Sequence, residues 1–129
     1  IFLMIFGIGH DIVENSRIAK LHDDYQINFA KKILTSLELV VYSNKKDKVQ
    51  FLFYSFTAKE AFAKACQTGL RNPVTLHNIG ILNNQLGKPY FYFTNELSAW
   101  LKTKNITNAH LSISDEATIS SAFVILESN

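Results

Sequence analysis

The sequence predicts an α+β fold in which a mainly antiparallel sheet packs against one long helix. After a short apolar strand, the first half of the chain is dominated by apolar residues at helical spacing. The second half consists mainly of β-prone runs, with one further helix between them. The chain has 129 residues, 47% of them hydrophobic, which fits a single domain over residues 1–129 with a sizeable core.

The elements of the first half follow from apolar spacing and from helix-breaking residues. The apolar run at residues 4–9 predicts a buried strand. A short helix is expected over residues 14–22, and further helical material over residues 25–42. This second stretch breaks into two pieces near Thr35–Ser36, where either hydroxyl could cap the second piece. The charged stretch 44–48 predicts a solvated turn.

A long amphipathic helix is predicted over residues 48–67, with Gly69 as its C-cap. Its apolar stripe, at spacings i, i+3, i+4 and i+7, consists of Val49, Leu52, Phe53 and Phe56. The next position on this stripe is Glu60, and Lys64 follows one turn later. A charge on a buried stripe needs a partner, a metal or a function. Glu60 is therefore either half of an exposed ion pair with Lys64 or part of a functional site.

The second half alternates strands with one helix. The β-prone runs cover residues 76–83, 90–93, 110–114 and 119–127. A turn that contains Gly87 and Pro89 joins the first two runs. A helix over residues 95–104, capped by Asn95 or Thr94, follows them, and the last two runs predict a hairpin.

Charge and composition argue against several classes of protein. The net charge of +2, from 13 basic and 11 acidic residues, is too balanced for a nucleic-acid or membrane-surface protein, so we expect neither partner. The single cysteine, Cys66, cannot form an internal disulfide, so we expect an intracellular protein, in the cytoplasm, or at least one that is indifferent to oxidation. The apolar start lacks the features of a signal peptide and is too short for a transmembrane helix, and Met4 could be the natural start.

Three acidic residues could carry chemistry. Asp11 follows the first apolar run, where it could be a ligand or an N-cap of the next helix, and Asp115 ends a strand where it could be a turn residue. Asp11 and Glu60 together could bind a hard metal ion, because Mg²⁺ needs only one or two protein carboxylates plus phosphate oxygens. Lys64 would then face the same phosphates. His110 begins the strand that leads to Asp115 and could reach the same site, or it could be structural.

Four motifs follow one another over nearly the whole chain. They are "IFGIGHDIVENSRI", "FTAKEAFAKACQTGLRN", "NNQLGKPYF" and "HLSISDEATISSAFVILE". Together they resemble the holo-[acyl-carrier-protein] synthase family, the small trimeric bacterial class of 4'-phosphopantetheinyl transferases. The resemblance implies the fold of that family and a step connected with fatty acid biosynthesis. In this step, Mg²⁺-dependent transfer moves 4'-phosphopantetheine from coenzyme A to a serine of apo acyl carrier protein and releases adenosine 3',5'-bisphosphate.

The resemblance also implies roles for single residues. Asp11 of the first motif and Glu60 of the second would bind Mg²⁺, or Mn²⁺ in its place. Glu60 is the first candidate, and Asp115 the second, for the base that activates the carrier serine. Lys64 would contact the phosphates as a point charge. Further contacts with coenzyme A are expected from Lys45, Lys46, Gly69 and His110.

The partners follow from the same resemblance. Carrier proteins of this kind are acidic helical bundles, which a basic surface would attract. We expect docking on Arg17 and Lys20, with Lys31 and Lys32 extending the basic patch. The resemblance also implies a homotrimer whose active sites lie between subunits.

Two positions depart from the family pattern. Ser55 stands where family members commonly have an arginine that helps to bind the nucleotide end of coenzyme A. Gln67 replaces the first glycine of the family's Gly-Thr-Gly turn. These departures leave two alternatives open. One is a non-catalytic carrier-protein or coenzyme-A-binding module of the same fold, and the other is a structural oligomerisation domain.

Overall fold

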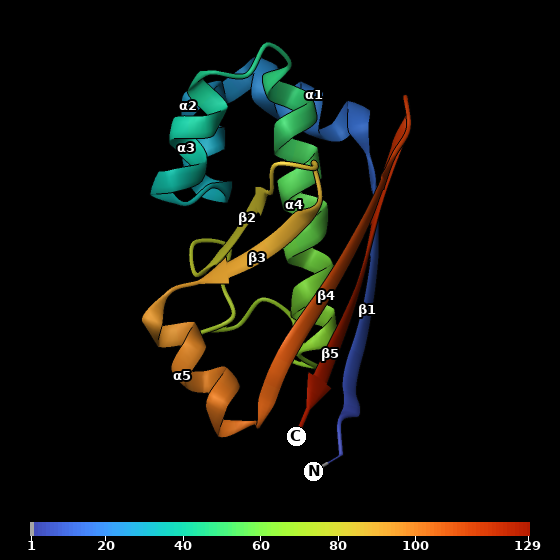
Figure 1. Ribbon diagram of the computed structural model, residues 1–129. Helices are drawn as coiled ribbons and strands as arrows, with labels where there is room; N and C mark the ends of the chain where they lie inside the picture. The colour runs from blue at the N-terminus through green and yellow to red at the C-terminus, as the bar shows by residue number, and fades with distance from the viewer. Residues whose placement is uncertain (1) are drawn as a thin grey trace.

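A computed structural model describes residues 2–129 and shows helices packed against antiparallel sheets, which confirms the predicted α+β class (Figure 1). The strands are β1 (Met4–Glu14), β2 (Ile79–Asn83), β3 (Pro89–Phe93), β4 (Ile106–Asp115) and β5 (Ile119–Ser128). The helices are α1 (Asn15–Tyr25), α2 (Ile27–Ile33), α3 (Ser36–Ser43), α4 (Lys48–Ala65) and α5 (Asn95–Thr103). None of these helices is long and apolar enough to cross a membrane, as far as residues 2–129 are concerned.

The strands form two antiparallel sheets. The larger sheet has the order β1-β5-β4, and β2 pairs with β3 in the smaller one. The first and last strands pair along their whole length, with Met4 opposite Ser128 and Asp11 opposite Ala122. The predicted hairpin is formed by β4 and β5, in which Asp115 lies opposite Ser120. Both chain ends therefore lie at the same end of the molecule (Figure 1).

Helix α4 runs along the three-stranded sheet, and α1, α2, α3 and β2 contact it from other directions (Figure 1). Most of its 18 residues are buried. The predicted single apolar stripe is wrong, because Val49 and Phe56 are only partly buried whereas Lys59 is 0% exposed. Neighbours on several sides bury most of the helix circumference, so the apolar residues do not keep to one face.

Buried side chains form two clusters along α4. One cluster joins α4 to both sheets and to α5, and it includes Phe62, whose ring centroid lies 5.0 Å from those of Phe91 and Phe93. The other cluster joins the N-terminal half of α4 to α1, α2 and α3 and includes Ile18 and Leu52. Full burial of a side chain such as Phe62 contributes about 1.5–3 kcal/mol, so these clusters hold α4 in place.

Two helix caps agree with the sequence pattern. Thr35 caps α3 in a capping box: its hydroxyl accepts from the Glu38 backbone, and the Glu38 carboxylate accepts from the Thr35 backbone. Thr94 caps α5 through its hydroxyl, which accepts from the backbone of Leu97. These residues fix where the two helices begin.

Several element boundaries differ from the prediction: α1 ends at Tyr25 and not at residue 22, β2 begins at Ile79 and not at residue 76, and three further differences are as follows. β1 continues from residue 9 to Glu14 because it pairs with β5 over its full length, so Asp11 lies inside a strand and is not a helix cap. The left-handed residue that ends α4 is Gln67, with φ 68°, and not the predicted Gly69. β4 begins at Ile106 and not at residue 110, again because the partner strand β5 is long.

Candidate functional site

Two glycines let β1 lie directly on the backbone of α4. A Cβ atom at Gly9 would lie 1.8 Å from the carbonyl oxygen of Ala61, and one at Gly7 would lie 2.0 Å from that of Ala65. Real Cβ atoms essentially never approach other atoms so closely. Only glycine fits here, and the close packing brings the next inward-facing residue of β1, Asp11, beside the last turns of α4.

Asp11, Glu60 and Lys64 form a cluster at this contact, which we call the Asp11–Glu60–Lys64 cluster. The Lys64 ammonium donates to Asp11 Oδ1 at 2.8 Å and to the backbone oxygen of His10 at 3.0 Å. The Asp11 side chain is 16% exposed and that of Lys64 52% exposed, so the cluster opens to solvent on the lysine side. Glu60 is half-buried one turn before Lys64 on α4. The structure thus brings together three residues that the sequence singled out.

The electrostatics of this cluster suit a bound cation. Burial raises the pKa of Glu60 above its ordinary value, the Asp11 carboxylate raises it further, and the Lys64 ammonium lowers it in part. A divalent ion would offset the repulsion that Glu60 experiences from Asp11, and both carboxylates offer the hard oxygen ligands that Mg²⁺ prefers. Among residues 2–129, no group of three or more His, Cys, Asp or Glu could hold a metal. Further ligands would have to come from a substrate or from water.

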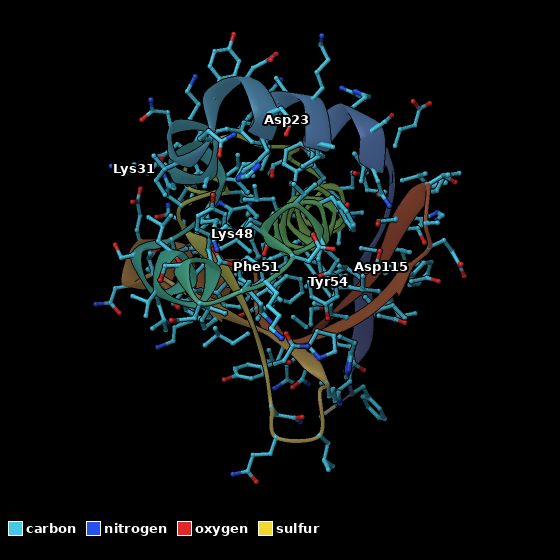
Figure 2. The ribbon with its side chains drawn as sticks, turned by 90° about the horizontal axis from the view of Figure 1, so that it is seen from above. Asp23, Lys31, Lys48, Phe51, Tyr54 and Asp115 are labelled. Carbon is cyan, nitrogen blue, oxygen red and sulfur yellow. The ribbon has the colours of Figure 1, made fainter. Side chains whose placement is uncertain are left out.

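The structure does not bring Asp115 to this cluster within one chain. One Asp115 oxygen accepts from the Gln50 amide at 2.6 Å, and the other lies 3.1 Å from the Ser120 hydroxyl. Gln50 precedes Glu60 by ten residues on α4, which is about 15 Å along a helix axis. Asp115 instead lines a cavity of about 620 Å³, together with Asn15 and residues of the β4–β5 turn. Viewed from above, it lies on the far side of the molecule from Lys31 (Figure 2).

Lys45 lies at a second hollow, of about 300 Å³, near the start of α4. This hollow is lined by Lys45, Gln50, Phe51, Tyr54, Asn83 and Gly87. The Lys45 ammonium lies 5.7 Å from the centroid of the Phe51 ring, a cation–π contact. Phe51 and Tyr54 both project from α4 (Figure 2). Lys46 is the next residue along the chain and is exposed.

The other predicted ligands of coenzyme A lie elsewhere. Gly69 is exposed in the turn after α4, with a φ of 65°. His110 lies 2.6 Å from a Glu127 carboxylate oxygen and is opposite Ile125 in the β4–β5 ladder. Because side chains alternate along a strand, His110 projects from the sheet face that is turned away from α4. Within one chain it therefore does not share a site with Asp11.

The predicted docking residues lie on α1. Arg17 and Lys20 are both exposed and three residues apart, so they share one helix face. A small hollow of about 190 Å³ lies nearby between α1 and α2, lined by Leu21, Tyr25, Asn28, Phe29 and Lys32. The surface thus combines exposed apolar side chains with lysine and arginine charges.

The two departures from the family pattern have distinct surroundings. Ser55 is 0% exposed, and its hydroxyl has no hydrogen-bond partner among the described residues. Gln67 adopts the left-handed backbone that glycine adopts most easily, and its amide donates to the Phe6 backbone oxygen at 3.0 Å. The replacement at 67 therefore keeps the turn, whereas position 55 carries no positive charge.

Apolar periodicity missed a buried ion pair on another side of α4. The Lys59 ammonium lies 2.6 Å from a Glu38 carboxylate oxygen, and both side chains are 0% exposed. The signal was available in the second motif, where Lys59 stands directly before Glu60. Its partner Glu38 lies 21 positions earlier on a different helix, so no local pattern could pair them.

Comparison with known proteins identifies relatives over nearly the whole chain. Residues 7–120 match the family model described as "4'-phosphopantetheinyl transferase superfamily". The holo-[acyl-carrier-protein] synthase of Nitrosospira multiformis is 49% identical over 124 residues, which cover 96% of this chain and 99% of that protein. That of Nitrosomonas europaea is 47% identical over 124 residues, with coverage of 96% and 99%.

Solved structures show the same relationship. The crystal structure of the holo-[acyl-carrier-protein] synthase from Neisseria meningitidis superposes with a TM-score of 0.92 at 45% identity and covers 95% of this chain and 98% of that one. The enzyme from Bacillus anthracis, in complex with CoA (3',5'-ADP), has a TM-score of 0.82 at 35% identity, with coverage of 98% and 99%. These matches confirm the resemblance that the four motifs indicated.

Proposed function

The chain belongs to the holo-[acyl-carrier-protein] synthase family of the 4'-phosphopantetheinyl transferase superfamily, and from this we propose its reaction. It transfers 4'-phosphopantetheine from coenzyme A to a serine of an apo acyl carrier protein and releases adenosine 3',5'-bisphosphate. The observation that carries the proposal is the Asp11–Glu60–Lys64 cluster, where two carboxylates and a solvent-exposed lysine meet. Phosphoryl transfer needs mainly positioning and stabilisation of charge, which such a cluster could supply.

Asp11 and Glu60 would hold Mg²⁺, for which Mn²⁺ could substitute. When bound, the ion would neutralise charge on the phosphates of coenzyme A. Lys64, exposed and beside Asp11, would add a positive charge to the same phosphates. Glu60 would accept the proton of the carrier serine, directly or through water, because it lies beside the place where the phosphates would bind.

The nucleotide end of coenzyme A would occupy the hollow beside Lys45. An aromatic ring, Phe51, and amide side chains such as Asn83 line this hollow, and Lys45 and its neighbour Lys46 supply positive charge. These lysines would replace the charge that Ser55 lacks at the position of the family arginine. Gly69, in the turn after α4, remains a proposed contact of coenzyme A.

We further propose a homotrimer in the cytoplasm. The face of the large sheet that is turned away from α4 exposes Ile8, Ile12, Ile119 and Phe123, with exposures between 42% and 58%. Exposed apolar side chains gathered on one sheet face favour burial against other copies of the chain. In such an assembly, His110 and Asp115 could serve the Asp11–Glu60–Lys64 cluster of a neighbouring subunit, with Asp115 as the second candidate for the base. Light scattering on the purified protein would measure the number of subunits.

The acidic carrier protein would dock on α1. Arg17 and Lys20 would attract it, and the apolar hollow beside Leu21 and Tyr25 would receive its apolar side chains. Arg17→Glu should then raise KM for the carrier at unchanged KM for coenzyme A. Unchanged transfer at low carrier concentration would exclude this docking surface.

The test of the reaction is the intact mass of an apo acyl carrier protein after incubation with this protein, coenzyme A and Mg²⁺. We expect a gain of one phosphopantetheine, abolished by a chelator or by Glu60→Gln. Glu96→Gln is the matched control, because Glu96 lies in the first turn of α5 and is exposed. A folded protein that binds coenzyme A but modifies none of several carriers would instead favour the non-catalytic module, the alternative that uncharged Ser55 supports.

A further inference from the structure

A second pair of opposite charges lies inside the protein, next to the Asp11–Glu60–Lys64 cluster in sequence but on another side of α4. Lys59 and Glu38 are both 0% exposed, and their charged atoms lie 2.6 Å apart. Lys59 cannot touch a substrate from this position. A buried ion pair often stabilises a fold no better than apolar residues of similar volume would. The Lys59–Glu38 pair is therefore expected to have a role other than stability.

The Lys59 ammonium uses all three of its hydrogen-bond donors. It donates to Glu38 Oε1 at 2.6 Å, to the Ile33 backbone oxygen at 2.7 Å and to the Leu76 backbone oxygen at 2.9 Å. These acceptors belong to the end of α2, to α3 and to the segment before β2. Three acceptors in fixed directions determine where the Lys59 nitrogen lies. A flexible apolar side chain at this position would not be held in one place in this way.

Glu38 is held just as firmly from its own side. Its Oε1 accepts from the Thr35 backbone at 2.9 Å, and its Oε2 accepts from the backbone of Ile81 in β2 at 2.9 Å. The Thr35 hydroxyl also bonds to the Tyr92 hydroxyl of β3. The pair is therefore anchored to α3 and to both strands of the smaller sheet.

The same turns of α4 are fixed from the side of the larger sheet. Gly9 and Gly7 press the backbone of β1 against the carbonyl groups of Ala61 and Ala65. Residues 59–65 of α4 are thus held by the hydrogen bonds of Lys59 on one side and by the close backbone contact with β1 of the larger sheet on the other. Both contacts oppose rotation of the helix about its axis, and together they favour one direction of the Glu60 side chain relative to Asp11.

We infer that Lys59, anchored by Glu38, is a positioning residue for Glu60. It sets the rotation of α4 that holds the Glu60 carboxylate beside Asp11, and it does so without contacting coenzyme A, carrier or metal. The inference rests on the proposed function, in which Asp11 and Glu60 share a cation. Residues that orient a metal ligand typically change metal affinity by about 10- to 100-fold when they are replaced.

The test replaces both charges at once, because Lys59→Met alone would leave Glu38 buried and unpaired. The double variant Lys59→Met/Glu38→Gln removes both charges and every bond to the ammonium, with a side chain one heavy atom shorter at position 59 and one fewer acceptor at position 38. Leu97→Ala is the control for lost stability, since Leu97 is 0% exposed and lies in α5, away from the cluster. For each protein, Mn²⁺ binding in the presence of coenzyme A is measured by electron paramagnetic resonance. KM and kcat are measured as well, with kcat calculated from the concentration of folded protein.

For the double variant we expect Mn²⁺ half-saturation to rise about tenfold and kcat to fall about 10- to 100-fold, with KM for the carrier unchanged. Leu97→Ala, at a matched loss of Tm, should change none of these values. Wild-type half-saturation and kcat in the folded double variant would overturn the inference. Where the double variant does not fold, Glu38→Asp decides by the same measurements, because it keeps the charge and moves the anchor by one methylene group.

The outcome also separates this inference from the proposed function. A wild-type protein that neither transfers phosphopantetheine nor binds Mn²⁺ with coenzyme A would refute the proposed function and the inference that depends on it. A wild-type protein that does both, with variants that match it, would refute the positioning role of Lys59 alone.

Discussion

The contact between β1 and α4 can be tested by one methyl group, in the variant Gly9→Ala. The added Cβ would lie 1.8 Å from the Ala61 carbonyl oxygen and 2.7 Å from the Ala65 nitrogen, whereas ordinary contact begins at 3.4 Å. Both obstacles are backbone atoms of a buried helix, so no side chain can move aside. The strand must therefore shift by about 1.6 Å, the difference between 1.8 and 3.4 Å.

This shift acts on both stability and activity. Overpacking of this kind costs about 1–3 kcal/mol of folding free energy. Asp11 lies two residues further along the same strand, so it moves relative to Glu60 by a comparable distance. A misplacement of about 1 Å at a catalytic group can lower the rate about 100-fold. We therefore expect Gly9→Ala to remain folded at low temperature but to lose most of its transfer activity.

The assay compares Gly9→Ala with Leu97→Ala, which removes buried volume from α5 and leaves β1 untouched. Urea unfolding gives the free energy of unfolding, and the intact mass of the carrier gives the initial rate of transfer under conditions where both variants are folded. Leu97→Ala should keep its rate despite a loss of about 2–5 kcal/mol. If Gly9→Ala retains both wild-type stability and wild-type rate, the close contact does not position Asp11.

Three further predictions concern single residues. The Lys64 ammonium lies 2.8 Å from Asp11 and competes with added cations, so Lys64→Met should bind Mn²⁺ alone about two- to tenfold more tightly. The same variant should bind coenzyme A more weakly. Calorimetry measures both affinities, with exposed Lys102→Met of α5 as the control, and weaker binding of Mn²⁺ would contradict the prediction. Burial raises the pKa of Glu60, so its ionised form lowers stability, and Glu60→Gln should raise Tm at pH 7. This gain should vanish as the pH falls through the raised pKa of Glu60 to below its ordinary value of 4.5, and a gain that is independent of pH would refute the burial of Glu60. Burial raises the pKa of the Cys66 thiol to about 12, so iodoacetamide at pH 8 should modify it only after unfolding, and rapid modification of the native protein would show the thiol to be exposed.

The sequence motifs predicted which residues of the candidate site lie together, whereas the apolar stripe, which first drew attention to Glu60, did not describe the burial of α4 correctly. Glu60 was singled out as the next position on a buried stripe, yet Lys59 is the fully buried charge and Glu60 is half-buried. The motifs nevertheless predicted that Asp11, Glu60 and Lys64 lie close together. They could do so because a family motif reflects contacts between distant segments, about which apolar periodicity gives no information. Periodicity assumes one buried face, and α4 is contacted from several sides.

Pairing between distant segments explains which features could not be predicted from local sequence patterns. β1 was predicted to end at residue 9, since the residues that follow, His10 and Asp11, break the apolar run. Its continuation to Glu14 depends on β5, whose residues stand at the other end of the chain. The partners of Lys59 and Asp115 likewise come from distant segments. The caps Thr35 and Thr94 depend on neighbours in sequence, and each is one of the two candidates that the sequence offered for its helix.

The pairing of β1 with β5 has a consequence for how the protein folds. In the large sheet, β5 is the central strand, so β1 and β4 both pair with it and not with each other. Asp11 of β1 lies opposite Ala122 of β5, which stands 111 positions later in the chain. Contacts of such high contact order form slowly. Until β5 has paired, the apolar strand β1 presents an unpaired edge, and a folding intermediate with such an edge is prone to aggregation.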